Sequence, residues 1–249
     1  MQNVNYSKET EKIIDRVRGL SPAPRLLLHS CCAPCSSYCL EYLREYFEIT
    51  VFYYNPNITE DGEYEKRKEE ELRLIGAYNR QVEEGRFEEE SGREEPGKAD
   101  PGGEESGAPE SGRRFAMHST TAAKKISVLE APYDPEAFLA MAKGLEQEPE
   151  GGARCMACYA LRLARTAQAA AEGGYDYFTT TLTISPLKNA ARLNEIGQQM
   201  AQKYGAVYLP SDFKKKNGYK RSTELSAVFG LYRQNYCGCV YSKQNRQNR

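Results

Sequence analysis

The sequence lacks the features that mark several large protein classes. No apolar run approaches the ~20 residues that a helix needs to cross a bilayer, and no charged segment followed by an apolar core opens the chain. There are only two histidines and no Ser/His/Asp grouping typical of a hydrolase, and no glycine loop has the spacing that binds phosphate. These absences predict a cytoplasmic protein with no membrane partner.

Net charge is also small, at −1, but it is unevenly distributed. Residues 83–112 contain eleven acidic and three basic side chains, a local balance of −8, which leaves +7 on the rest of the chain. Because this stretch holds almost no large apolar side chain, burial cannot offset the entropy lost on ordering it. We predict a single catalytic domain over 1–249 with a disordered acidic insertion at 83–112. The basic remainder permits a polyanionic partner such as RNA.

Short apolar runs alternate with segments of helical periodicity along most of the chain. The first run ends at three cysteines, where a helix should begin, and a charged helix is expected over 61–77. This alternation predicts an α/β fold with three layers around a mostly parallel sheet. Sites in such sheets lie at the carboxyl ends of strands, so Cys31, Cys32, Cys35 and the loop 181–188 should share one edge. The expected strands are 26–29, 49–54, 126–129, 175–182 and 206–209.

Cysteines provide most of the chemistry that the sequence offers. Cys155-x-x-Cys158 is expected to open a helix, and this spacing lets both sulfurs reach one centre. With Cys31 and Cys32 the pair offers four thiolates, the usual complement of an iron–sulfur cluster or a structural zinc. Successive side chains on extended backbone point apart, so we expect Cys31 and Cys32 to suit a cluster or two metals rather than one small ion. Cys39, on the inner face of a helix, is expected to be an ordinary buried thiol.

Two other interpretations of these cysteines stay open. Cys32-Ala-Pro-Cys35 after a strand is typical of a thioredoxin-like thiol–disulfide oxidoreductase, in which Pro186 would be the proline beside the dithiol. That chemistry needs neither Cys31 nor a second Cys-x-x-Cys pair. A structural zinc would instead indicate an RNA-binding module that is stabilised by its metal and has no redox role.

Cys237-Gly-Cys239 forms a third set of thiols near the end of the sequence. A disulfide across one intervening residue closes a small ring, and departures from relaxed geometry make a bridge easier to reduce. Labile bridges of this kind tend to be catalytic or regulatory. The alternative is that the pair supplies two more metal ligands.

Basic and histidine residues give weaker indications. The run from Lys214 to Arg221 carries five positive charges beside Tyr219, so it is a candidate to hold phosphates and stack a base. Such a run is also typical of a solvated surface. His29 ends an expected strand, and a packed structural role is favoured for it over a catalytic one.

Several longer motifs extend this pattern along the chain. In their order they resemble the QueH-type family of epoxyqueuosine reductases, and the resemblance covers nearly everything except the first ~20 residues and the acidic insertion. Motifs of this length in this order are far more specific than any single cysteine pair. The motifs are Leu28–Cys35, Tyr53–Ile58, Arg154–Cys158, Phe178–Pro186, Asp212–Lys216 and Tyr232–Ser242.

The resemblance implies a function and a set of site residues. It implies a two-electron reduction that removes the epoxide oxygen of epoxyqueuosine at the tRNA wobble position, the last step of queuosine biosynthesis, with an unidentified electron donor. It also implies a fold like that of the PP-loop nucleotide-binding proteins, with cysteines where the phosphate loop would lie. The implied residues are Cys31, Cys32, Cys155 and Cys158 for a [4Fe–4S] cluster, Cys35 for a fifth ligand or an additional iron, and Cys237 with Cys239 for a redox-active disulfide.

Overall fold

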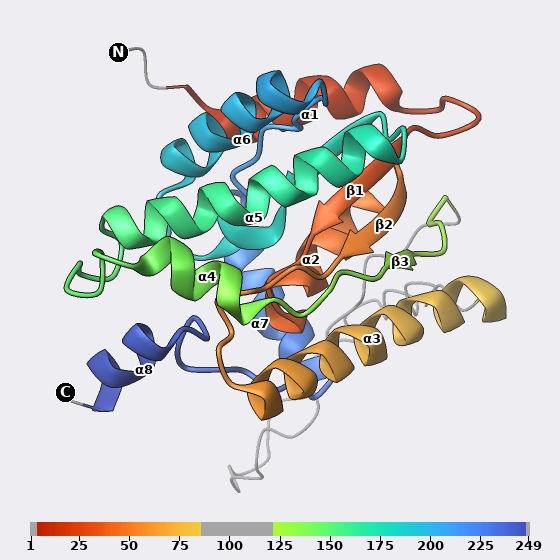
Figure 1. Cartoon of the computed structure of the whole chain (residues 1–249). Helices are drawn as coiled ribbons and strands as arrows, with labels where there is room; N and C mark the ends of the chain where they lie inside the picture. The colour runs from red at the N-terminus through yellow and green to blue at the C-terminus, as the bar shows by residue number, and fades with distance from the viewer. Residues whose placement is uncertain (1–3, 86–121, 248–249) are drawn as a thin grey trace, which may run out of the picture.

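The computed structural model describes residues 4–85 and 122–247. Four parallel strands form one sheet in the order β3-β2-β1-β4, with helices on both faces (Figure 1). The strands are β1 (Arg25–His29), β2 (Glu48–Phe52), β3 (Ser127–Leu129) and β4 (Tyr177–Thr180). The helices are α1 (Tyr6–Val17), α2 (Ala33–Leu43), α3 (Asp61–Glu84), α4 (Pro135–Ala142), α5 (Ala153–Glu172), the 3₁₀ helix η1 (Thr181–Ile184), α6 (Ala190–Tyr204), α7 (Gly218–Val228) and α8 (Val240–Gln247).

Strand β1 lies at the centre of three layers and is buried on both faces. Leu26 and Leu28 pack on one face against α1, α2 and α3, in the cluster that also holds Leu40. Leu27 packs on the opposite face with Phe178 and the small side chains of α5 and α6. Successive side chains of a strand point to opposite faces, so a run of three leucines fills both layers. The predicted three-layer α/β fold is confirmed, and the sheet is parallel throughout the described strands.

The turn from β1 to α2 places three cysteines at the carboxyl edge of the sheet. Cys32 adopts extended backbone as the residue before the helix, and Pro34 occupies the first turn, where its missing N–H is not needed. Strand β4 runs beside β1 in register, His29 opposite Thr180, so η1 begins at the same edge. The expectation that Cys31–Cys35 and the loop 181–188 share one edge is therefore confirmed.

Several predicted elements differ from the structure, among them the strand expected over 49–54, which ends at Phe52. The strand expected over 206–209 forms only one bridge, between Tyr208 and Phe178. The strand expected over 175–182 ends at Thr180, because the Thr180 hydroxyl accepts a hydrogen bond from Leu182 N–H and starts η1. Helix α3 continues past 77 to Glu84 and ends at Gly85 (φ 58°), so the first residues of the predicted insertion at 83–112 are helical or cap the helix. The rest of that insertion lies outside the described residues.

Within residues 4–85 and 122–247, none of the helices combines the length and the apolar character that a membrane span requires.

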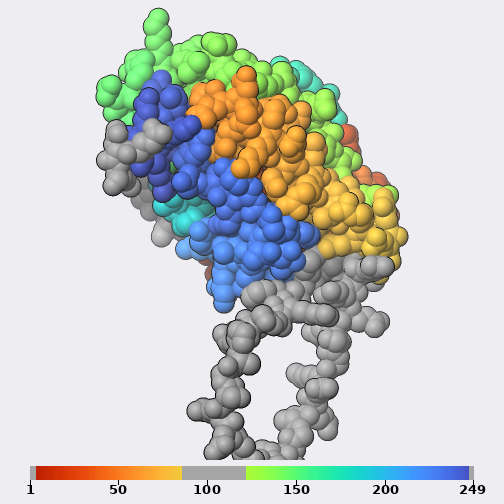
Figure 2. All heavy atoms as spheres, turned by 90° about the horizontal axis from the view of Figure 1, so that it is seen from below, coloured from red at the N-terminus to blue at the C-terminus, as the bar shows by residue number. Residues whose placement is uncertain are grey.

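The C-terminal part of the chain packs against earlier elements. Figure 2 shows the segment after α7, in blue, against the start of α3, in orange. Helix α8 lies next to α4 (Figure 1), where Tyr241 contacts Phe138 with ring centroids 6.3 Å apart.

Candidate functional site: a cavity lined by cysteines

One cavity of about 390 Å³ opens at the carboxyl edge of the sheet and gathers most of the cysteines. Its walls come from the β1–α2 turn, the start of α5, η1 with the loop after it, and the segment between α7 and α8. The eighth cysteine, Cys39, is fully buried in the core against the sheet, as expected. The seven cysteines that line the cavity are Cys31, Cys32, Cys35, Cys155, Cys158, Cys237 and Cys239.

Three of these thiols form a tight group. The sulfurs of Cys31, Cys32 and Cys35 all lie within 4.8 Å of one another, and no other described group of three His, Cys, Asp or Glu residues does so. Cys31 and Cys32 sulfurs are 3.8 Å apart, so the expectation that adjacent thiols point apart was wrong. Both residues lie in the turn between the end of β1 at His29 and the start of α2 at Ala33, where the alternation of a regular strand no longer applies.

Thr181, the first residue of η1, supports this group. Its hydroxyl lies 3.3 Å from Cys31 Sγ and accepts a hydrogen bond of 3.2 Å from Cys31 N–H. Hydrogen bonds with Cys32 and Cys35 lower the pKa of Cys31, and the charges of Lys188 and Arg162 act in the same direction. The geometry therefore favours a thiolate at Cys31.

Helix α5 connects the two sets of thiols. Cys155 packs in one apolar cluster with Cys31, whereas Cys158 packs in another with Cys237 and Cys239. Cys155 and Cys158 line the cavity but do not belong to the group within 4.8 Å. The structure thus brings the four predicted cluster ligands to one cavity, and places Cys35 closer to Cys31 and Cys32 than the α5 pair.

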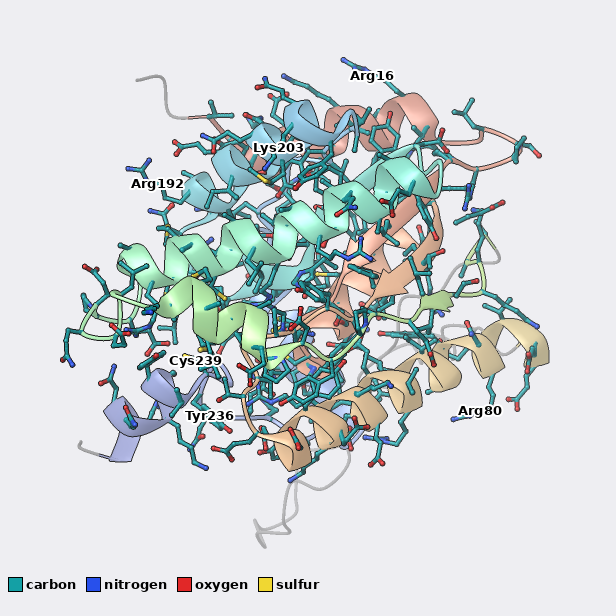
Figure 3. All side chains as sticks on the ribbon, in the orientation of Figure 1. Arg16, Arg80, Arg192, Lys203, Tyr236 and Cys239 are labelled. Atoms are coloured by element: carbon teal, nitrogen blue, oxygen red, sulfur yellow. The ribbon has the colours of Figure 1, made fainter. Side chains whose placement is uncertain are left out.

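The dithiol of Cys237 and Cys239 is held by its backbone. The two sulfurs are 3.5 Å apart, and this hydrogen bond lowers the pKa of Cys237 to about 5. The Cys237 carbonyl accepts hydrogen bonds from Asn57 Nδ2 (3.1 Å) and Arg67 Nη1 (3.3 Å), and Arg67 Nη2 donates to the carbonyl of Tyr236 (3.4 Å). Figure 3 shows Tyr236 and Cys239 together beside α8. Neither Asn57 nor Arg67 was singled out from the sequence, because each acts through a carbonyl 170 or more residues away.

Positive charge prevails on the described walls of the cavity, which carry six basic residues and one acidic residue, Glu150. Lys188 lies between the thiol sets: burial lowers its pKa, but the surrounding Cys31, Cys35 and Cys237 raise it above its ordinary value. Arg192 does not reach this site, since it pairs with Glu195 on an exposed face of α6 and points away from Cys239 (Figure 3). The cavity is therefore suited to an anionic occupant.

The basic run on and before α7 is largely neutralised within the protein. Lys214 pairs with Asp212, Lys216 with Glu11, and Arg221 with both Glu41 and Glu224. Among the described residues, only Lys215 and Lys220 of the five form no ion pair. Tyr219 lines the cavity and is 41% exposed, so the aromatic part of the expected RNA-binding feature does lie at the site.

His29 has the packed role that the sequence favoured. It is fully buried, and burial together with the charge of Arg162 lowers its pKa to about 3, so the ring is neutral. Arg162 itself was not predicted, although a signal existed: it follows Cys158 by four residues, which places both on one face of a helix.

The match to a family model shows to which protein family this chain belongs. The model described as epoxyqueuosine reductase QueH matches residues 26–99 and 108–245. The chain belongs to the QueH family. All seven cysteines of the cavity lie within the matched residues.

Curated members of the QueH family align over most of this chain. The epoxyqueuosine reductase QueH of Staphylococcus epidermidis is 39% identical over 243 residues, 97% of this chain and 85% of the relative. That of Streptococcus pyogenes is 38% identical over 241 residues, 97% of this chain and 79% of the relative. That of Thermotoga maritima is 30% identical over 224 residues, 90% of this chain and 93% of the relative. The family membership predicted from the motifs is confirmed, and with it the class of enzyme, an oxidoreductase.

The donors in the cavity fit a metal centre of the kind expected in this QueH-family chain. Thiolates are the ligands of iron–sulfur clusters and of many zinc sites, and the Cys31, Cys32, Cys35 group offers three on one wall, with Cys155 and Cys158 on another. The buried cations beside them favour the deprotonated, ligating form of a thiol. Which of the five thiols hold a metal remains a prediction.

Proposed function

We propose that this chain reduces epoxyqueuosine in tRNA to queuosine, with an iron–sulfur centre and a redox-active dithiol in the same cavity. The names of its relatives support the substrate and the reaction. The observation that carries the proposal is the convergence of seven thiols from three separate segments on one cavity. With a tRNA substrate, we expect the reaction to take place in the cytoplasm.

The proposed reaction balances with the dithiol as reductant. Opening the epoxide breaks two C–O bonds, forms a C=C bond and releases the oxygen as water, which takes up two electrons and two protons. Conversion of Cys237 and Cys239 from two thiols to one disulfide supplies the same two electrons and two protons. The disulfide must then be reduced again by an external electron donor, whose identity the cavity does not reveal.

The metal centre would be held by the remaining thiols. Cys31, Cys32, Cys155 and Cys158 provide four ligands for a [4Fe–4S] cluster, and Cys35 lies close enough to the first two to ligate an additional iron. Such a centre supplies single electrons and, at an iron with an open position, a Lewis acid for the epoxide oxygen.

The protein around these thiols would bind the modified base. Tyr219 and Tyr236 line the cavity and offer ring faces on which a base can stack. Lys188 and Arg233 line it too and offer positive charge to the phosphates of the tRNA backbone. The cavity volume of about 390 Å³ lies within the range that holds small ligands, which suits one extruded base rather than a duplex.

Purification without oxygen tests the metal centre, and turnover of cysteine variants tests the dithiol. We expect a broad absorbance near ~400 nm that bleaches with dithionite, together with bound iron and sulfide. Cys237→Ser and Cys239→Ser should each reduce turnover of epoxyqueuosine-containing tRNA by ~100-fold or more, because the dithiol acts as one unit. Cys39→Ala is the matched control, since it removes one buried thiol outside the cavity and should retain turnover.

Other outcomes would favour the alternatives. A colourless protein with stoichiometric zinc would indicate the RNA-binding module. A protein without metal that reduces small disulfides would indicate the thioredoxin-like enzyme. Unchanged turnover in Cys239→Ser would exclude the dithiol from the reaction.

A further inference from the structure

Arg162 is a buried cation beside the thiols for which the structure offers only neutral partners. Its side chain is 4% exposed, lines the cavity, and lies on α5 one turn after Cys158. The guanidinium donates from Nη2 to Asn55 Oδ1 (2.5 Å) and from Nε to His29 Nε2 (3.3 Å). Across residues 4–85 and 122–247, no carboxylate forms an ion pair with it.

Both neutral partners are fixed in orientation. Asn55 Nδ2 donates to the Ser30 carbonyl at 2.9 Å, which turns Oδ1 toward Arg162. The His29 ring is held at both nitrogens: Nδ1 lies 2.8 Å from Thr180 Oγ1, and Nε2 lies 3.1 Å from the Tyr54 carbonyl as well as 3.3 Å from Arg162 Nε. Apart from the guanidinium, this network carries no charge.

A buried guanidinium is costly unless an anion lies beside it. The only acidic side chain among the described residues of the cavity wall is Glu150, and it forms no ion pair with Arg162. Apart from the tyrosine phenols of the wall, the remaining groups that can carry negative charge are the thiols, and Cys158 lies one turn before Arg162 on α5.

We propose that Arg162 is a positioning residue whose fixed positive charge balances the iron–thiolate centre of this cavity and controls how tightly that centre is held and how readily it is reduced. His29 and Asn55 act through Arg162, because they hold its guanidinium against α5 without neutralising it. The inference rests on the proposed function, since it requires an anionic centre on the cysteines. It goes further by assigning a role to three residues that are neither ligands nor members of the dithiol.

The test compares the wild-type chain with R162Q, R162K and R165Q, each purified and reconstituted with iron and sulfide without oxygen. Iron and sulfide per chain, the rate of iron loss to a chelator, and the midpoint potential are measured for each. We expect R162Q to lose iron ~10-fold faster, as when a group behind a metal ligand is removed. Its midpoint potential should move to more negative values, because a missing positive charge disfavours the added electron.

Two variants serve as controls. R162K keeps the charge, so it should hold iron almost as well as the wild-type chain. R165Q removes a guanidinium from the same helix, but the Arg165 side chain is 37% exposed and its partner is Glu172, so iron loss and potential should not change. Circular dichroism of the metal-free proteins shows whether each variant is folded.

Three results would overturn the inference. If R162Q holds iron and is reduced like the wild-type chain, Arg162 has no such role, and the proposed function still stands. If R162K loses iron as fast as R162Q, the positive charge of Arg162 does not hold the iron. If R162Q does not fold, R162K is compared with the wild-type chain instead, and much faster iron loss from R162K contradicts the inference. If the wild-type chain takes up no iron at all, both the inference and the proposed iron centre are wrong.

Discussion

At the scale of single residues, Glu71 stands out as a carboxyl group buried beneath the cysteine turn. It lies on α3, is 1% exposed, and its neighbours include Ser30 and Ser36, whose hydroxyls are 2.6 Å apart. Burial raises the pKa of Glu71 from 4.5 to about 7, although the two serines act in the opposite direction. The cost of ionising this residue therefore depends on pH near neutrality.

Glu71→Gln tests that cost. The folded-state pKa lies above the unfolded value, so wild-type stability decreases as pH rises from 4.5 to about 7 and levels off above that. The amide cannot ionise, so the free energy of unfolding of the variant should rise relative to that of the wild-type chain by ~3 kcal/mol over this pH interval. Urea unfolding of both proteins at pH 5 and pH 8 measures the difference.

Glu69→Gln is the control for this comparison, because Glu69 is exposed on the same helix. It should leave the pH dependence of unfolding unchanged. An identical pH dependence in the wild-type chain and Glu71→Gln would show that Glu71 ionises as freely in the folded protein as in the unfolded one.

At the scale of structural elements, the segment before α8 depends on one glycine between the two cysteines. Gly238 has φ +109°, a conformation that side chains disfavour. A Cβ atom there would lie 2.8 Å from Ile58 Cγ1 and 3.1 Å from Arg67 Nη1. Because Arg67 also donates to the Cys237 carbonyl, a side chain at Gly238 would displace the group that positions the dithiol.

Gly238→Ala should therefore destabilise the fold by ~2 kcal/mol through backbone strain and contact and slow formation of the Cys237–Cys239 disulfide. Thermal unfolding and the rate of oxidation by glutathione disulfide measure the two effects. Gly230→Ala is the matched control: its φ is also positive (+57°), but no atom lies within 4 Å of the added Cβ. It should lose stability and oxidise at the wild-type rate. If Gly238→Ala oxidises at the wild-type rate, the hydrogen bonds from Arg67 to this segment do not position the two thiols.

At the scale of the whole molecule, the distribution of ion pairs determines which charges remain for tRNA. Three of the five basic residues between 214 and 221 are paired with carboxylates, so their charges are already balanced. Lys215 and Lys220 have no such pair among the described residues; Lys220 follows Tyr219 directly on α7, and Lys215 lies three residues before that helix. These two are the candidates to contact phosphates.

Replacing Lys215 and Lys220 together by Gln should weaken tRNA binding and reduce the slope of log K against log salt by ~1–2, because each lost phosphate contact removes ~0.7–0.9 from the slope. Binding is measured over a range of salt concentrations. Lys203→Gln is the control, since Lys203 lies on α6, away from Cys239 (Figure 3). An unchanged slope in the double variant would exclude both lysines from the tRNA contact.

Much of the site could be predicted from local sequence. The alternation of apolar and polar segments indicated a parallel α/β sheet, and the position of Cys31, Cys32 and Cys35 after a strand indicated the carboxyl edge, because parallel strands all end there. Cys155 and Cys158 were assigned to the same site from their spacing. The limits of β4 and α3 were wrong: a hydroxyl cap at Thr180 ended the strand, and α3 continued through the buried Tyr78 to Gly85.

The sequence by itself determined the family, the layer order of the fold and the thiols of the cavity, because these depend on periodicity and on motifs that lie within single segments. Only the tertiary structure decided which groups surround those thiols. Asn57 and Arg67 reach the dithiol, and Arg162 meets His29 and Asn55, across 107 to 180 residues of chain. Such contacts depend on how the elements pack, so no local pattern carries them.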